Sequence, residues 1–333
     1  MKKFRNISLM FLALLFLMDA TSLLIADGDT LTSSQKIQKK KNRRQKSKRR
    51  QKRKRIANPP TTHADVRYGK YKRNVLDIWL AKSESPTPLI VYIHGGGFVA
   101  GSKRSLNRAL LRDCLKSGIS VAAIHYRFVT TAMFPAPQKD SARAIQFLRY
   151  RAKDWNLDPK RFAAFGGSAG AGISMWLAFH DDMADAKSDD PVLRQSSRLS
   201  CVGSFGGQPT YDPNVMKAWV GGRVHEHPSI FKCYNIKSIE EIHDPKLQSL
   251  FDEVSAITHL TKDDPPVFQY YSQPNRPLPK NARPGQGVHH PIFGLKLKAE
   301  LDKLKIANEY VHRDNFRGNP FLKMLAFFKT HLE

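Results

Sequence analysis

RFAAFGGSAG, residues 161–170, is a short apolar run that ends in glycines around a single serine. Ser168 has Gly166 and Gly170 two positions away on either side, and a helix-like apolar segment follows it. A serine bracketed in this way between a strand and a helix fits G-x-S-x-G, a sharp turn that exposes the hydroxyl. Because a hydroxyl needs a base and oxyanion donors to act as a nucleophile, the rest of the chain must supply both.

Outward from this turn, strand and helix patterns alternate along the chain. Continuous apolar runs indicate strands buried on both faces, whereas apolar spacing of three to four residues indicates helices. The pattern predicts an α/β fold with a doubly wound, mostly parallel sheet, helices on both faces and a small cap-like insertion at 212–262. Strands are expected at 75–81, 87–93, 119–127, 161–167, 199–207, 265–272 and 308–313, and helices at 106–118, 135–156, 169–182, 291–305 and 320–333.

A second glycine-rich turn, HGGG at 94–97, follows the expected strand at 87–93. In a parallel sheet the carboxyl ends of the strands meet at one edge, where ligands bind. Glycines let the backbone approach a substrate carbonyl, and the helix after Ser168 points amides at the place where charge develops. We therefore expect the backbone amides of Gly96, Gly97 and Ala169 to form an oxyanion hole.

Several segments carry a resemblance to a known family: DVRYGKYKRNVLDIWLA, VYIHGGGFVAGSK, FPAPQKDSARAIQFLR and FGGSAGAG. Together they resemble the α/β-hydrolase family of carboxylesterases and lipases, in particular its hormone-sensitive-lipase and feruloyl/acetyl-esterase-like branch. The resemblance runs from about residue 64 to the end and is densest over 87–172. It implies hydrolysis of small-molecule or carbohydrate esters through an acyl-serine intermediate, with no cofactor and no metal.

The chain departs from that family where the rest of a catalytic triad is expected. The position after the strand at 265–272 that best matches the family's aspartate holds Asn275. An amide can orient an imidazole but cannot stabilise an imidazolium by charge. The loop after the strand at 308–313 contains no histidine, and His312 lies inside the strand pattern.

Other residues could complete the site. The segment 281–291 resembles an insertion that leaves the active-site edge of the sheet, so we expect the base to be His290, then His289, then His312. For the acid, Asp212 follows the expected strand at 199–207, and Asp314 is a weaker candidate. Two functions stay open: a serine carboxylic-ester hydrolase, or a catalytically impaired protein of the same fold that binds a ligand or partner.

The N-terminal part of the chain differs in composition from the rest. Residues 1–26 combine early basic residues with an apolar run, which predicts a signal peptide or N-terminal anchor and hence export to the periplasm or the cell exterior. Residues 27–60 read as a disordered basic linker, and 61–333 as the hydrolase domain. The tract 36–55 holds 14 of the 55 lysines and arginines of a chain with net charge +26.

The basic tract and the cysteines limit the partners that we expect. A tract of like charges suits an anionic surface, whereas nucleic acid is disfavoured because no aromatic residue interleaves the charges. The three cysteines are too few for a disulfide framework and show no metal-ligand spacing.

Overall fold

The computed structural model describes residue 38 and residues 59–333. The expected signal segment 1–26 lies outside the described residues, as does the basic tract 36–55 apart from residue 38. Among the described residues, no helix combines the length and apolar character that crossing a membrane requires. Cys114, Cys201 and Cys233 are all free and buried.

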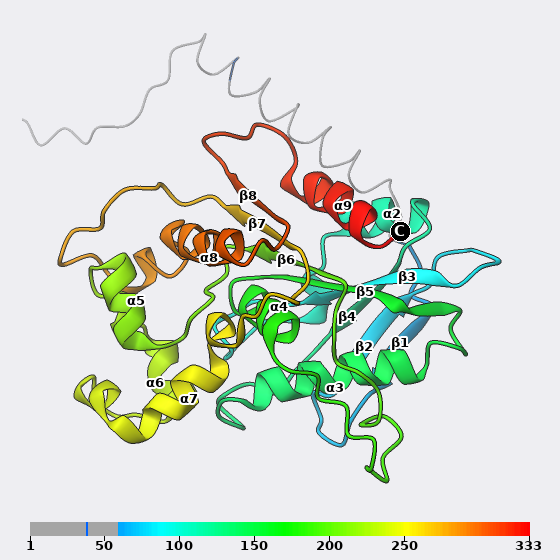
Figure 1. The fold of residues 1–333 in the computed structure, drawn as a ribbon, viewed down its shortest axis with the longest axis horizontal. Helices are drawn as coiled ribbons and strands as arrows, with labels where there is room; N and C mark the ends of the chain where they lie inside the picture. Colours follow the sequence, from blue (N-terminus) through cyan, green and yellow to red (C-terminus); the bar gives the residue numbers. More distant parts are fainter. Residues whose placement is uncertain (1–37, 39–58) are drawn as a thin grey trace, which may run out of the picture. The chain divides into compact units, whose positions relative to one another are not determined.

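The described chain forms one eight-stranded sheet in the order β1-β2-β4-β3-β5-β6-β7-β8 (Figure 1). All neighbours from β4 to β8 are parallel, while β1 and β2 join antiparallel at one edge. This confirms the predicted mostly parallel sheet. The strands are β1 (His63–Arg67), β2 (Val75–Trp79), β3 (Thr87–Ile93), β4 (Ser120–Ile124), β5 (Leu157–Gly167), β6 (Cys201–Phe205), β7 (Val267–Tyr271) and β8 (Asn308–His312).

Helices cover both faces of the sheet because successive strand side chains point to opposite faces. In β3, Val91 packs with the cluster under α3, α4 and α8, whereas Ile90 packs with the cluster under α2 and α9. This confirms the predicted double winding (Figure 1). The helices are α2 (Arg108–Lys116), α3 (Ala136–Tyr150), α4 (Ala169–Phe179), α8 (Ile292–Lys303) and α9 (Pro320–His331).

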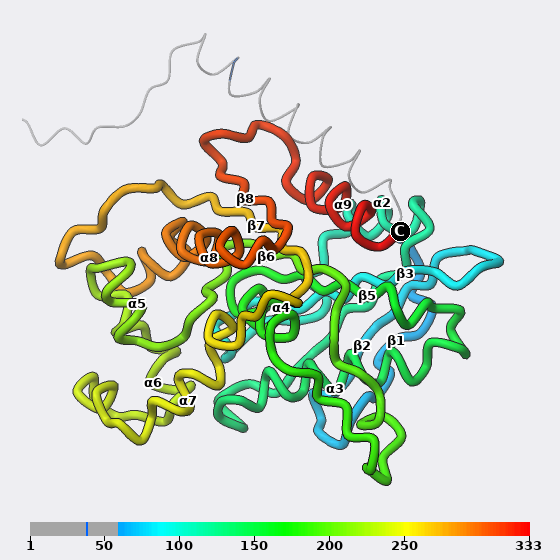
Figure 2. The backbone as a smooth tube through the Cα atoms, viewed as in Figure 1, coloured from blue at the N-terminus to red at the C-terminus, as the bar shows by residue number. Residues whose placement is uncertain are grey.

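The chain between β6 and β7 is the predicted cap-like insertion, built from short helices and 3₁₀ turns. Figure 2 shows the tube leaving β6, passing through α5, α6 and α7, and returning to β7. The elements are α5 (Pro213–Val220), η2 (Val224–Glu226), α6 (Pro228–Tyr234), η3 (Glu240–His243), η4 (Pro245–Leu247), α7 (Gln248–Val254) and η5 (Ala256–His259). Two further 3₁₀ turns lie elsewhere, η1 (Lys103–Ser105) and η6 (Pro284–Gln286).

The start of α4 crosses the end of β3 at a separation that only glycine allows. A Cβ atom on Gly170 would lie 2.1 Å from the Ile93 carbonyl oxygen and 2.7 Å from the His94 carbonyl oxygen. A Cβ on Gly166 would meet the same Ile93 oxygen at 2.5 Å. These contacts are with backbone, which cannot rotate away, so the two glycines bring the serine turn against the end of β3.

We predict that Gly170→Ala destabilises the protein, because the new methyl group must displace backbone. Overpacking of this kind costs about 1–3 kcal/mol. The matched control is Gly285→Ala, since a Cβ at Gly285 would meet no atom within 4 Å. Urea denaturation of both variants measures the difference, and equal stability of the two would contradict the packing argument.

Candidate active site

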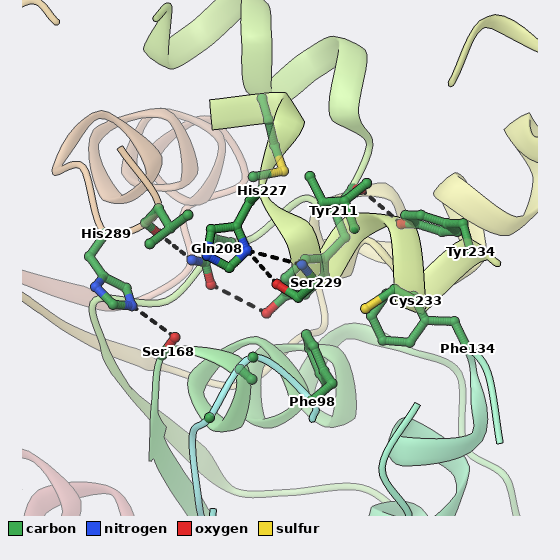
Figure 3. A pocket seen from close by; sticks show the side chains of 16 residues that line it. Phe98, Phe134, Ser168, Gln208, Tyr211, His227, Ser229, Cys233, Tyr234 and His289 are labelled. Atoms are coloured by element: carbon green, nitrogen blue, oxygen red, sulfur yellow. Dashed lines mark hydrogen bonds between the residues drawn. The ribbon is translucent and has the colours of Figure 1, made fainter. Parts of the chain in front are cut away.

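Ser168 lies at the turn between β5 and α4, with a φ of +54° and a ψ of −124°. A positive φ is uncommon for a residue with a side chain and marks stored strain. The turn is held by the Ser168 amide, which donates to the Phe205 carbonyl at 2.9 Å, and by the Gly172 amide, which donates to the Ser168 carbonyl at 3.0 Å. The result places the Ser168 hydroxyl on the wall of a cavity (Figure 3).

His289 is the imidazole that contacts this hydroxyl. Its Nε2 lies 2.8 Å from Ser168 Oγ, and Figure 3 shows the two side chains pointing toward each other. Burial lowers the pKa of His289 below its ordinary value of 6.5, and the neighbouring His227 lowers it further. The ring is therefore neutral at pH 7, with Nε2 able to accept the Ser168 proton.

Two contacts position His289, which comes from the loop between β7 and α8. The Gln208 side-chain amide donates to the carbonyl of Val288, the residue before the histidine. Gly206, with a φ of +59°, lies close under the ring, since a Cβ there would be 3.4 Å from His289 Cβ. Gln208 and Gly206 both follow β6, so the segment after that strand holds His289 beside Ser168.

The structure reverses the expected order of the two adjacent histidines. His290 does not contact Ser168: its Nδ1 accepts from the Ile292 amide at 3.1 Å, and its Nε2 donates to the Arg276 carbonyl at 3.0 Å. With both ring nitrogens bonded to backbone and the ring buried, His290 holds the loop shape instead. His289, the second candidate, occupies the place expected for His290.

Asp212 is not brought to the imidazole. Its carboxylate caps α5, because Oδ1 accepts from the Asn214 amide at 2.8 Å and from the Val215 amide at 3.4 Å. Asp-Pro at a helix start is a common cap. The structure thus shows Asp212 in the local role that its sequence neighbours favour.

Among the described residues, the remaining candidates make no hydrogen bond to Ser168 or His289. Asn275 is exposed. His312 Nε2 donates to the Gln273 carbonyl at 2.7 Å, and its Nδ1 lies 3.5 Å from the exposed Asp314 carboxylate. Within residues 59–333, no carboxylate hydrogen-bonds His289 or contributes to its pKa shift. The described site is therefore a serine–histidine pair without a third acidic member.

The three residues expected to supply oxyanion donors line the same cavity as Ser168. Gly96 and Gly97 have φ values of +120° and +57°, and Ala169 is the first residue of α4. The Gly96, Gly97 and Ala169 amides donate no hydrogen bond within the described part of the chain. They are thus free to bind a developing negative charge, although the assignment of the hole itself stays a prediction.

The cavity beside Ser168 has a volume of about 370 Å³. The cap supplies much of its wall, and aromatic rings pack around one end, with Phe98 and Phe134 centroids 4.8 Å apart and Phe98 and Tyr211 centroids 5.1 Å apart. A space of this size suits a small ligand. Its lining comprises Gly96, Gly97, Phe98, Phe134, Ser168, Ala169, Gln208, Tyr211, Met216, His227, Ser229, Ile230, Cys233, Tyr234, Val288 and His289.

His227 is a cavity residue that sequence reasoning missed. It is the N-cap of α6: its Nδ1 accepts from the Ser229 amide at 3.3 Å and bonds the Ser229 hydroxyl. Burial lowers the pKa of His227, so the ring is neutral and carries its proton on Nε2. A cap followed by Pro228 predicts a helix start, but no sequence signal brings that helix to Ser168.

Comparison with known proteins agrees with this fold. The chain resembles a solved acetyl ester-xyloside bifunctional hydrolase from Caldicellulosiruptor lactoaceticus, with a TM-score of 0.60, 20% identity, and coverage of 82% of this chain and 93% of that one. It also resembles a carbohydrate esterase from gut microbiota, with a TM-score of 0.60, 19% identity, and coverage of 83% and 98%. These similarities show the α/β-hydrolase fold.

Curated relatives match at the level of sequence. A probable carboxylic ester hydrolase of Mycobacterium tuberculosis, LipM, is 26% identical over 65% of this chain and 48% of its own length. A probable isoprenylcysteine alpha-carbonyl methylesterase of Arabidopsis thaliana is 28% identical over 78% of this chain and 53% of its own length. The chain thus spans about half the length of these relatives. The BD-FAE family model matches residues 76–280, and this chain belongs to that family.

Proposed function

We propose that this protein is a carboxylic ester hydrolase that acts through an acyl-serine intermediate. The observation that carries the proposal is the 2.8 Å contact between Ser168 Oγ and His289 Nε2 in a cavity that free backbone amides also line. The esterase names of the relatives support the reaction class. A purely ligand-binding role is not favoured, because nothing in binding alone requires a neutral base on a strained serine.

Acylation begins with the ester carbonyl over Ser168. His289 Nε2 accepts the hydroxyl proton while Oγ attacks the carbonyl carbon, and the amides of Gly96, Gly97 and Ala169 bind the oxyanion. When the tetrahedral species collapses, the imidazolium returns its proton to the departing alcohol oxygen. The acyl group is left on Ser168, and His289 is neutral again.

Deacylation repeats the same proton movements with water. His289 accepts a proton from a water molecule that attacks the acyl carbon, the same amides bind the second oxyanion, and the proton passes to Ser168 Oγ as the acid leaves. No other titratable group of the chain is needed for either half.

Because no carboxylate hydrogen-bonds His289 within residues 59–333, we expect a low rate of ester hydrolysis. A buried acid normally orients the imidazole and stabilises the imidazolium, and replacing it by an amide costs up to about 10⁴-fold in rate. Here orientation comes from Gln208 through Val288 and from packing on Gly206. We therefore propose a slow esterase whose base is held by backbone contacts.

The cavity favours small substrates. Its volume of about 370 Å³ and its aromatic end suit a short acyl group, and the Nε2 proton of His227 offers a hydrogen bond to an oxygen of the substrate. We propose small-molecule or carbohydrate esters, because the structural relatives include an acetyl ester-xyloside hydrolase and a carbohydrate esterase.

We predict that His289→Gln lowers kcat/KM for p-nitrophenyl acetate by about 10²–10⁴-fold, because glutamine cannot accept the serine proton. Ser168→Ala abolishes the same activity. The matched control is His290→Gln, since a glutamine there can still donate to the Arg276 carbonyl. An equal loss in both glutamine variants would show that the loop, and not a base at 289, matters.

We predict that kcat/KM falls in acid with a midpoint below pH 6.5, the ordinary pKa of histidine, because burial and His227 lower the pKa of His289. The active form is the neutral ring, so activity persists as the pH falls past 6.5 and disappears when His289 takes up a proton.

His227→Gln provides the test of the electrostatic part of this shift. Without the second imidazole, protonation of His289 becomes easier, and the acid midpoint moves upward toward 6.5. A wild-type midpoint above 6.5, or a downward move in the variant, would contradict the assignment of His289 as a neutral base.

A further inference from the structure

A second cluster of titratable side chains lies at the far end of α4 from Ser168. His180 follows the last residue of α4, Glu253 lies on α7 and His259 ends η5. One ligand atom from each residue lies within 4.8 Å of the others. The 11 residues of α4 span about 16 Å, so the cluster is separate from the cavity at Ser168.

The hydrogen bonds of both imidazoles leave a lone pair on each ring. His180 Nδ1 donates to the Asp181 carbonyl at 2.9 Å, so its Nε2 is unprotonated in the neutral ring. His259 Nε2 donates to the Glu253 carbonyl at 2.9 Å, so its Nδ1 is unprotonated. Histidines that bind metals are usually held in this way, with the other ring nitrogen donating to a backbone carbonyl.

The carboxylate of Glu253 is the third donor. Its Oε2 lies 3.7 Å from His180 Nε2, close to the separation of about 3.4 Å between two ligands of a tetrahedral ion with bonds of about 2.1 Å. All three side chains are half-buried, which leaves room for small rotations and for a water ligand. Two imidazoles, one carboxylate and an open position form the donor set that zinc prefers.

We propose that His180, Glu253 and His259 bind one divalent transition-metal ion, with zinc as the best fit. The neighbouring cation, Arg198, does not oppose this, because its guanidinium lies 3.3 Å from the Asp264 carboxylate. The ion joins α4, which packs on the sheet, to α7 and η5 of the cap. Trp176 already makes the same connection, since its indole donates to the Glu253 carbonyl at 2.7 Å.

Metal binding to the chain of residues 1–333 tests this proposal. Residues 1–58 contain no histidine or cysteine, so the N-terminal segment adds no imidazole or thiol ligand. After chelator treatment, calorimetric titration with zinc chloride is expected to show one ion per chain. Zinc is also expected to raise the midpoint of thermal unfolding, because an ion that binds only the folded state stabilises it.

Zinc binding by variants tests whether the ion is held by His180, Glu253 and His259. His180→Gln and His259→Gln are expected to weaken zinc binding by at least about 10-fold and to remove the thermal shift. His243→Gln, which alters an exposed histidine outside the cluster, is expected to bind as the wild type does. Absence of stoichiometric binding by the unaltered chain would overturn the proposal whether or not the variants fold, and so would unchanged binding by both cluster variants.

Discussion

The approach of α4 to the end of β3 is the constraint on which the site depends. The Ile93 carbonyl leaves no room for a side chain at Gly166 or Gly170, and a Cβ on Gly95 would lie 2.5 Å from the Gly167 carbonyl. The turns after β3 and β5 therefore touch through backbone atoms, with no side chain between them. Because of that contact, the glycine turn after β3 lies beside Ser168, and its amides and the start of α4 line one cavity.

The electrostatics of the cavity follow from burial. His289 and His227 are both neutral because each is withdrawn from water, and a charge on His227 would oppose protonation of His289. In the described part of the chain, the base has no carboxylate to stabilise its charged form. Hydrogen bonds therefore hold the loop that carries the His289 imidazole, where a carboxylate would normally orient the ring. The Gln208 side chain bonds the Val288 carbonyl, and the His290 ring bonds the Arg276 carbonyl.

The parts of the fold and the site that depend on local sequence could be predicted. Ser168 lies between a strand pattern and a helix pattern, and Gly96 and Gly97 take positive φ values within one short turn, so both turns could be located from the sequence. The buried parallel strands have continuous apolar runs. By contrast, β1 is exposed along most of its length and pairs only at the edge, so its sequence shows no apolar pattern.

The parts that depend on distant contacts could not be predicted. His289 and His290 are adjacent, and what selects between them is a hydrogen bond from Gln208, 80 residues before Val288. Nothing local distinguishes them. Asp212 looked like an acid because it follows a strand, but Pro213 after it was the better signal for a helix cap. His227 immediately precedes α6, a short helix whose place over the cavity is fixed by tertiary packing.

Covalent labelling shows directly whether Ser168 is an activated nucleophile. A fluorophosphonate reacts with a serine only when its proton is removed and its oxyanion is bound, so it reports the assembled pair rather than binding. The Ser168–His289 pair is expected to give one adduct per folded chain, mapped by mass spectrometry to Ser168 and lost after denaturation. A folded chain that hydrolyses esters yet carries no adduct, or carries it on another residue, would show that Ser168 is not the nucleophile.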